Sequence, residues 1–227
     1  MKFLVLADIH SDIEKLSKIL DSVDGDAIDA VLFSGDVVDE HTTPHGFTLT
    51  DMIDVFVQKL LVFGKPTFCV PGNIDPLDII DIYEDYGINI HNKKKKIKDL
   101  TIIGWGGALT PFNTSFEPPE GETREALERL TTNLTGEFIL LLHNPPKDTK
   151  LDLVGGKHVG SAAEKELVEK KKPLLVLSAH IHESPGIDKI GDTTIFYPGP
   201  VFNGHYGIVE INGKRVKCVS KKITSAA

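Results

Sequence analysis

The sequence predicts an α/β fold in which residues 1–227 form one domain. Short, continuously apolar runs alternate with longer amphipathic segments, a pattern typical of parallel strands that are buried on both faces. The chain has 227 residues, of which 41% are hydrophobic, and this is enough for one substantial core. No linker or internal repeat divides the sequence. The five apolar runs are residues 3–7, 31–35, 68–72, 139–142 and 174–179.

The first half of the chain alternates between predicted strands and predicted helices. Helical spacing is clearest at Ile53, Phe56, Val57 and Leu60, which fall on one face of a helix. The predicted strands span residues 2–7, 30–34, 66–70, 88–90 and 96–103, and the predicted helices span residues 12–22, 50–61 and 77–86.

A run of four lysines, from Lys93 to Lys96, lies between the last two of these strands. We interpret this run as a polar turn or an exposed strand edge, because lysine often protects the edges of sheets. A nucleic-acid patch is the weaker alternative, since the formal net charge of -8 argues against an extended surface for DNA or RNA. A small phosphate-containing substrate fits this charge better.

The second half of the chain combines two long loops with further helices and strands. Gly104, Gly106 and Gly107 lead into a loop that ends near Gly121, and their spacing does not match a dinucleotide-binding fingerprint. The segment 143–160 is long for a connection inside a domain, and such loops are usually functional or disordered. The predicted helices are residues 123–134 and a helix capped by Ser161 that ends near residue 171, followed by β segments at residues 187–190, 193–197, 207–211 and 215–219.

The sequence favours a cytoplasmic location. Residues 1–7 resemble the start of a signal peptide, but Asp8 interrupts the apolar run before it reaches the roughly 7 to 15 residues of a signal-peptide core. No other stretch approaches the roughly 18 apolar residues of a membrane span. Cys69 and Cys218 lie far apart, and we interpret both as core thiols of a protein in a reducing compartment. Residues 224–227 are predicted to fray.

Each of the five apolar runs ends next to a residue that can bind a metal ion. The carboxyl ends of parallel strands meet at one edge of a sheet, so we expect these side chains to lie together. Asp8 and His10 are separated by one residue, and so are His180 and His182. In extended backbone, the two members of each pair are expected to point to the same side. The seven candidate ligands are Asp8, His10, Asp36, Asn73, His143, His180 and His182.

The chemistry of these donors selects the kind of ion. Mixed nitrogen and oxygen ligands suit Mn, Fe, Zn, Co or Ni better than Mg or Ca, which favour oxygen alone. Two divalent ions carry four positive charges, of which Asp8, Asp36 and a bridging hydroxide neutralise three. The remaining positive charge can attract a phosphate group, and the neutral Asn73 preserves that surplus.

The order and spacing of these residues resemble those of the calcineurin-like metallophosphoesterases over nearly the whole chain. Small stand-alone archaeal and bacterial members are most similar. The resemblance implies a four-layer αββα sandwich, with two mixed β-sheets packed face to face and helices outside. It also implies two divalent metal ions, with Mn expected first. Asp8, His10, Asp36 and His182 would hold one ion, and Asp36, Asn73, His143 and His180 would hold the other.

The resemblance further implies that the protein hydrolyses phosphate esters. Two ions about 3.5–4 Å apart would lower the pKa of a bridging water, and the hydroxide would attack phosphorus in line with the leaving group. Asp36, Asn73 and His143 would take part in catalysis through the metals. We expect a phosphodiesterase rather than a phosphomonoesterase. The sequence does not indicate the natural substrate or the oligomeric state.

Two departures from the family pattern concern single positions. Many members carry a histidine after the asparagine as a leaving-group acid, and this chain has Ile74 there. We expect His158 to serve as the acid or as a phosphate contact, with His41 and His45 as weaker candidates. Ala179 stands where glycine is common, and its methyl group could strain the turn if φ is positive. Ile74 also leaves open an alternative, a catalytically weak or inactive protein of this fold that acts as a binding scaffold.

Overall fold

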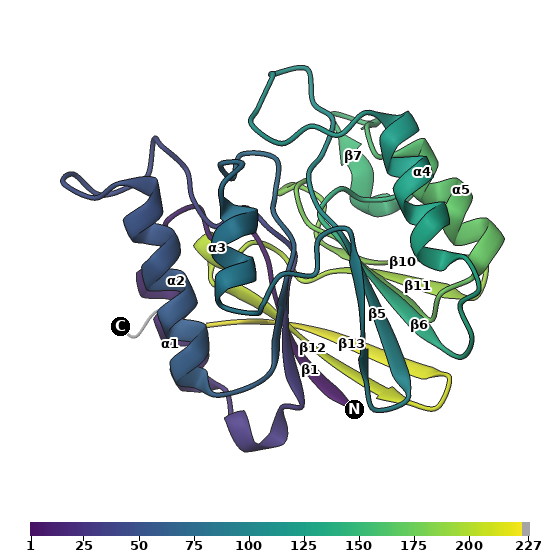
Figure 1. The fold of residues 1–227 in the computed structure, drawn as a ribbon, viewed down its shortest axis with the longest axis horizontal. Coiled ribbons are helices and arrows are strands. Elements are labelled where there is room, and N and C mark those ends of the chain that lie inside the picture. Colours follow the sequence, from purple (N-terminus) through teal and green to yellow (C-terminus); the bar gives the residue numbers. More distant parts are fainter. Residues whose placement is uncertain (224–227) are drawn as a thin grey trace.

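The fold has four layers, in which two mixed β-sheets pack face to face between two layers of helices (Figure 1). The structure is a computed structural model, and it describes residues 1–223. The predicted αββα sandwich is therefore confirmed. The expected fraying of residues 224–227 lies outside the described residues.

The five-stranded sheet has the order β13-β12-β1-β2-β3. Its strands β1, β2 and β3 are parallel, and β12 pairs with β1 in the antiparallel direction. Three helices cover its outer face. The strands are β1 (Lys2–Leu6), β2 (Ala30–Phe33), β3 (Thr67–Cys69), β12 (His205–Asn212) and β13 (Arg215–Lys222), and the helices are α1 (Ile13–Ser22), α2 (Leu49–Phe63) and α3 (Ile79–Asp85).

The six-stranded sheet has the order β10-β11-β9-β6-β5-β4. Its four central strands are parallel, while the strands at the two edges are antiparallel to their neighbours. Helices α4 (Glu120–Thr131) and α5 (Ala162–Lys171) cover its outer face. The strands are β4 (Lys93–Ile97), β5 (Leu100–Trp105), β6 (Phe138–Leu142), β9 (Leu175–Leu177), β10 (Gly186–Ile190) and β11 (Thr193–Tyr197).

Successive side chains of one strand enter two different hydrophobic cores, one on each face of the sheet. In β1, Leu4 and Leu6 pack against the helices, whereas Phe3 and Val5 enter the core between the sheets. Successive side chains of a strand point to opposite faces, so a strand buried on both faces must be apolar throughout. The continuous apolar runs of the sequence therefore identified the central strands correctly.

Several predicted boundaries were wrong. Residues 88–90 contain a single isolated bridge, at Asn89, instead of a strand, and the predicted strand at 96–103 is part of a hairpin of β4 and β5. Helix α4 begins at Glu120, three residues before the predicted start, with Pro119 at its N-cap. The predicted loop at 143–160 contains the short hairpin of β7 (Leu153–Val154) and β8 (Lys157–His158).

Two other predicted details were correct, namely the edge position of the lysine run and the cap of α5. The lysine run lies on β4, which is an edge strand, and Ser161 caps α5 by accepting a hydrogen bond from the Glu164 backbone. Cys69 is buried and Cys218 is half-buried, and both are free thiols. Among the described residues, no helix combines the length and the apolar character needed to cross a membrane.

Candidate metal centre

The loops that follow five strands, three in one sheet and two in the other, bring the predicted ligands together. Two groups of side chains form there, and within each group one ligand atom per residue lies within 4.8 Å of the others. Asp36, which is buried, belongs to both groups. The first group is Asp8, His10, Asp36 and His182, and the second is Asp36, His143 and His180.

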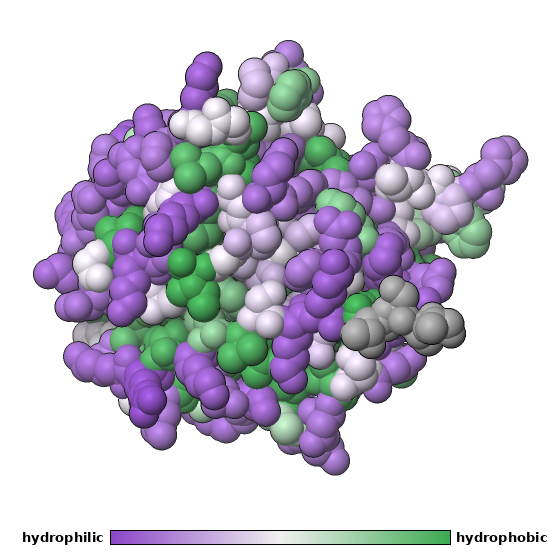
Figure 2. Space-filling view, turned by 180° about the vertical axis from the view of Figure 1, so that it is seen from behind, coloured by the Kyte–Doolittle hydropathy of each residue, from purple (hydrophilic) through white to green (hydrophobic). Residues whose placement is uncertain are grey.

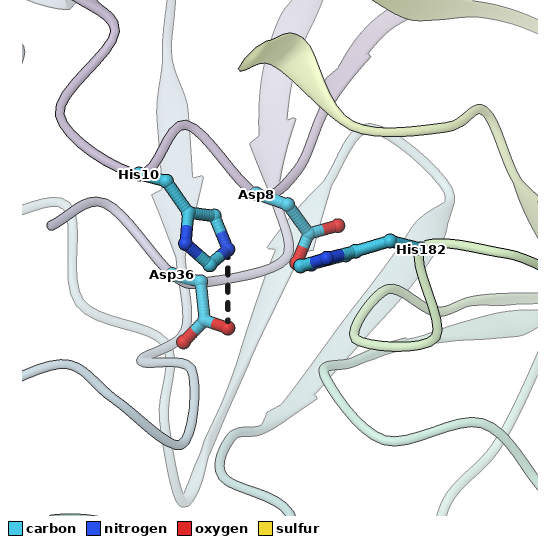
Figure 3. A group of neighbouring side chains, drawn as sticks. All are labelled: Asp8, His10, Asp36 and His182. Carbon is cyan, nitrogen blue, oxygen red and sulfur yellow. Dashed lines mark ion pairs between the residues drawn. The ribbon is translucent and has the colours of Figure 1, made fainter. Parts of the chain in front are cut away.

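In the first group, two histidines face two carboxylates (Figure 3). His10 Nε2 lies 3.7 Å from Asp36 Oδ2, and His182 Nε2 lies 3.5 Å from Asp8 Oδ1. The other oxygen of Asp8, Oδ2, accepts a hydrogen bond of 2.6 Å from the hydroxyl of Tyr197. This bond leaves Oδ1 of Asp8 directed toward the histidine.

The second group includes Asn73 through its side-chain oxygen. His143 Nε2 lies 3.3 Å from Asp36 Oδ2 and 3.0 Å from Asn73 Oδ1. The amide nitrogen of Asn73 donates to the hydroxyl of Thr114, which lies in the loop between β5 and α4. That hydrogen bond orients the amide so that its oxygen faces the group.

The unpaired nitrogen atoms fit a metal ion better than they fit a purely structural cluster. Within residues 1–223, Nε2 of His10 and Nε2 of His182 are buried and have no hydrogen-bond partner. Nδ1 of His10 lies 3.3 Å from Asp39, and Nδ1 of His143 donates to the Ser34 carbonyl at 2.7 Å. Metal-binding histidines are typically held in this way by their second nitrogen. These residues could therefore hold divalent ions.

The backbone of the ligand loops is not extended, contrary to the prediction. Asp8, His10, Asp36 and His180 have φ values of 52°, 47°, 59° and 70°, in the left-handed region that non-glycine residues rarely adopt. Asp8 and His10 nevertheless both belong to the first group, but the members of the second pair are separated. His180 belongs to the second group, whereas His182 belongs to the first. Conformations of this kind often occur at functional sites.

Two glycines allow the loops of β2 and β3 to touch. Gly35 has a φ of 98°, and a Cβ atom on Gly72 would lie 1.9 Å from Asp36 Oδ1. Asp75 then joins the two loops, because its buried carboxylate accepts hydrogen bonds from the backbone of Asp36, Val37, Val38 and Gly72. The position of Asp36 is thus fixed by backbone contacts as well as by its side chain.

The electrostatics of the centre couple carboxylates to histidines. Burial disfavours protonation of His143, but the carboxylates of Asp36 and Asp8 and the Ser34 carbonyl together outweigh burial and raise the pKa of His143 to about 9. Burial would raise the pKa of Asp36, but His143, His10 and His180 together outweigh burial and hold this pKa well below its usual range. Burial, assisted by His143, lowers the pKa of His180 to about 4.

The predicted acid, His158, does not belong to either group. It lies on β8, where Nδ1 is 2.6 Å from the buried carboxylate of Asp152. His41 and His45 are exposed in the loop before α2 and also lie outside both groups. Ala179 has no positive φ, so its methyl group does not strain the turn. The Ile74 backbone donates to Asp36 Oδ1 at 3.1 Å.

Sequence reasoning missed the residues that orient the ligands: Asp39, Asp75, Thr114 and Tyr197. Asp39 lies 29 positions from His10, and Thr114 lies 41 positions from Asn73. Tyr197 lies 189 positions from Asp8. Only Asp75 stands beside a recognisable motif, two residues after Asn73. The other contacts depend on the tertiary fold.

Comparisons with known proteins agree with this geometry. The model of the calcineurin-like phosphoesterase family matches residues 1–184. An uncharacterized protein of Methanocaldococcus jannaschii is 40% identical over 138 residues, which make up 58% of this chain and 63% of that protein. The match thus spans less than two thirds of that relative's length.

Solved structures share the fold at low sequence identity. One crystal structure, 18% identical, has a TM-score of 0.82 and covers 98% of this chain and 99% of its own. Protein TT1561 of Thermus thermophilus, 20% identical, has a TM-score of 0.73 and covers 96% and 97%. A dimetal phosphatase from Danio rerio, 10% identical, has a TM-score of 0.68 and covers 99% of both chains.

Proposed function

Because the chain belongs to the calcineurin-like phosphoesterase family, we propose that it is a metal-dependent hydrolase of phosphate esters. One observation carries the proposal: two groups of potential ligands share the buried carboxylate of Asp36. A shared carboxylate suits a centre of two ions. The dimetal phosphatase from Danio rerio, which has the same fold, supports this number of ions.

The two groups and Asn73 divide the ligands between the ions. We assign Asp8, His10, Asp36 and His182 to one ion, and Asp36, Asn73, His143 and His180 to the other. Mn²⁺ is expected first, with Fe, Zn, Co or Ni as alternatives, because the donors are mixed. When bound, such a pair of ions supplies an activated water at neutral pH and stabilises the charge of an in-line displacement at phosphorus.

The residues of the chain hold this centre in place before any ion binds. Tyr197 occupies one oxygen of Asp8, Thr114 fixes the amide of Asn73, and Ser34 fixes the ring of His143. Ligands that are oriented beforehand lose less freedom on binding. The complete set of oriented donors favours an enzyme over the alternative of a binding scaffold.

The aliphatic side chain of Ile74 cannot donate a proton to a leaving group. General acid catalysis contributes roughly 10²–10⁴ in rate, so we propose a preference for phosphodiesters with good leaving groups. His158 is the proposed acid for poorer leaving groups, since Asp152 binds its Nδ1 and leaves Nε2 free, and Nε2 donates a proton when the ring is in its imidazolium form. If a His158→Ala variant hydrolysed alkyl and aryl diesters as fast as the unmodified protein, His158 would have no such role.

Hydrolysis of a chromogenic diester tests the proposal. Protein loaded with Mn²⁺ is expected to hydrolyse bis(4-nitrophenyl) phosphate faster than 4-nitrophenyl phosphate. Loss of residues that merely orient a metal ligand costs about 10–100-fold, so Asp36→Asn should lose at least about a hundredfold in kcat/KM. Asp54→Asn, at an exposed position on α2, is the matched control and should retain full activity. No hydrolysis with any divalent ion would contradict the proposal.

A further inference from the structure

A groove opens directly beside the first group of ligands. Its volume is about 510 Å³, and His10 forms part of its wall together with Ser11 and Thr42. Cavities of about 300–1,000 Å³ are typical of small-molecule sites. Because His10 lines the groove and also faces Asp36, the groove and the metal centre share a wall.

The far side of the groove is apolar. Phe47 lies in the loop before α2 with 53% of its surface exposed, and Met52 and Val55 follow on α2. The loop projects from the molecule beside α2 (Figure 1), and Figure 2 shows apolar and hydrophilic side chains mixed on this projection. An exposed aromatic ring at the edge of a pocket suits stacking against a flat group.

Hydrogen bonds join the base of this loop to His10 and Ser11, which lie at the metal centre. The Thr42 hydroxyl donates to the His10 carbonyl at 2.6 Å, and the hydroxyls of Ser11 and Thr43 lie 2.9 Å apart. Asp39 adds its contact with the His10 ring. The wall that carries Phe47 is thereby held in a fixed relation to His10.

The charges of the groove do not favour an anionic group, such as a second phosphate of the substrate, as its occupant. Among the described residues that line it, none is lysine or arginine, and the ionisable side chains besides His10 are Asp12 and Glu14. Each of these carboxylates is paired with a lysine of α1, Lys15 and Lys18 respectively. The groove therefore offers hydrogen-bond acceptors and apolar surface, but no cation for an anionic group.

We propose that this groove binds the organic portion of the substrate, and that this portion is a flat, uncharged group with hydrogen-bond donors, such as a nucleoside. The proposal rests on the proposed function, because the phosphate must sit at the metal centre while the attached group extends past His10. It narrows the substrate class to phosphodiesters of nucleosides or similar ring-bearing alcohols, and it makes Phe47 a specificity residue.

Two chromogenic diesters with the same leaving group test this inference. Thymidine 5′-monophosphate 4-nitrophenyl ester carries a nucleoside, and methyl 4-nitrophenyl phosphate carries a methyl group in its place. We expect the Mn²⁺-loaded protein to prefer the nucleoside ester in kcat/KM. Phe47→Ala should lower that preference about tenfold, because base–aromatic stacking contributes on that order. The loss should fall mainly on KM.

Phe112→Ala is the matched control. Phe112 is 79% exposed and lies in the loop between β5 and α4, outside the groove. This variant should leave the ratio of the two kcat/KM values unchanged. Loss of the preference in Phe112→Ala instead of Phe47→Ala would overturn the inference, and so would an unchanged ratio in Phe47→Ala.

A binding measurement separates this inference from the proposed function. Saturation-transfer NMR with thymidine requires no catalysis, and thymidine should bind the unmodified protein and Phe112→Ala equally and should bind Phe47→Ala about tenfold more weakly. If neither diester is hydrolysed while this pattern holds, the proposed function fails and the groove inference stands as a nucleoside site. If the esters are hydrolysed while thymidine binds all three proteins equally or none of them, the groove inference alone fails.

Discussion

At the scale of single residues, the fold places strained backbone where the ligands are needed. Asp8, His10, Asp36 and His180 all adopt left-handed conformations, which cost of order 1–3 kcal/mol each and persist only where the surroundings hold them. Around Asp36 that support comes from Asp75, whose carboxylate accepts four backbone hydrogen bonds from the two adjoining loops. Asp75 is therefore a positioning residue for the shared ligand.

Removing the Asp75 carboxylate should destabilise the protein. Asp75→Ala leaves several buried N–H groups without an acceptor, each costing about 1–3 kcal/mol, so we expect a loss of at least about 3 kcal/mol. Urea denaturation of the metal-free protein measures this change. Asp54→Ala, on the exposed face of α2, should change the free energy of unfolding by less than about 0.5 kcal/mol. A loss no larger than that of the control would mean that the carboxylate does not hold the loops.

At the scale of elements, the start of α4 caps the start of α5. The carboxylate of Glu120 accepts hydrogen bonds from the Ser161 hydroxyl and from the backbone of Ala162 and Ala163. Anions are stabilised at helix N-termini in this way. Glu164, in the first turn of α5, is 1% exposed, and its Oε2 has no hydrogen-bond partner within residues 1–223.

This arrangement predicts a pH-dependent stability. Burial raises the pKa of Glu164 well above its ordinary value of 4.5, and the charge of Glu120 adds to the increase. Above pH 4.5 the unfolded chain has released a proton that the folded protein still holds, so this group makes stability fall as pH rises toward the folded pKa. Its contribution is constant below that window.

Glu164→Gln should remove that dependence. The neutral amide has no charge to bury and can donate to Glu120, so at pH 8 we expect the variant to be more stable than the unmodified protein by about 1–3 kcal/mol. The difference should shrink as the pH approaches 4.5. Thermal unfolding of metal-free protein across this range measures it, with Glu169→Gln on the exposed side of α5 as control. A constant difference between pH 4.5 and 8 would contradict the assignment.

At the scale of the whole molecule, the strands and the ligands were predictable from sequence for a physical reason. A strand buried on both faces must be apolar throughout, and the residue that ends such a run stands out by its polarity. Asp36 and His143 were found in this way. The resemblance to the family then supplied the four-layer arrangement, which composition and periodicity alone did not indicate.

The remaining features depend on contacts that no local pattern encodes. The left-handed backbone at Asp8 and His10 is imposed by the packing of neighbouring loops, so the prediction of extended pairs was wrong. Helix α4 starts at Glu120, whose carboxylate binds the start of α5, a segment that is distant in sequence. The hydrogen bond from Tyr197 to Asp8 joins residues 189 positions apart.

The fold as a whole brings ligands from both sheets to one centre, and the number of bound ions tests that account most directly. Metal analysis of protein equilibrated with Mn²⁺ and then freed of unbound ions should give two ions per chain. Asp36→Asn should hold at most one, because Asp36 belongs to both groups, while Asp54→Asn should hold two. One ion or fewer per chain in the unmodified protein, or two ions in Asp36→Asn, would contradict the account.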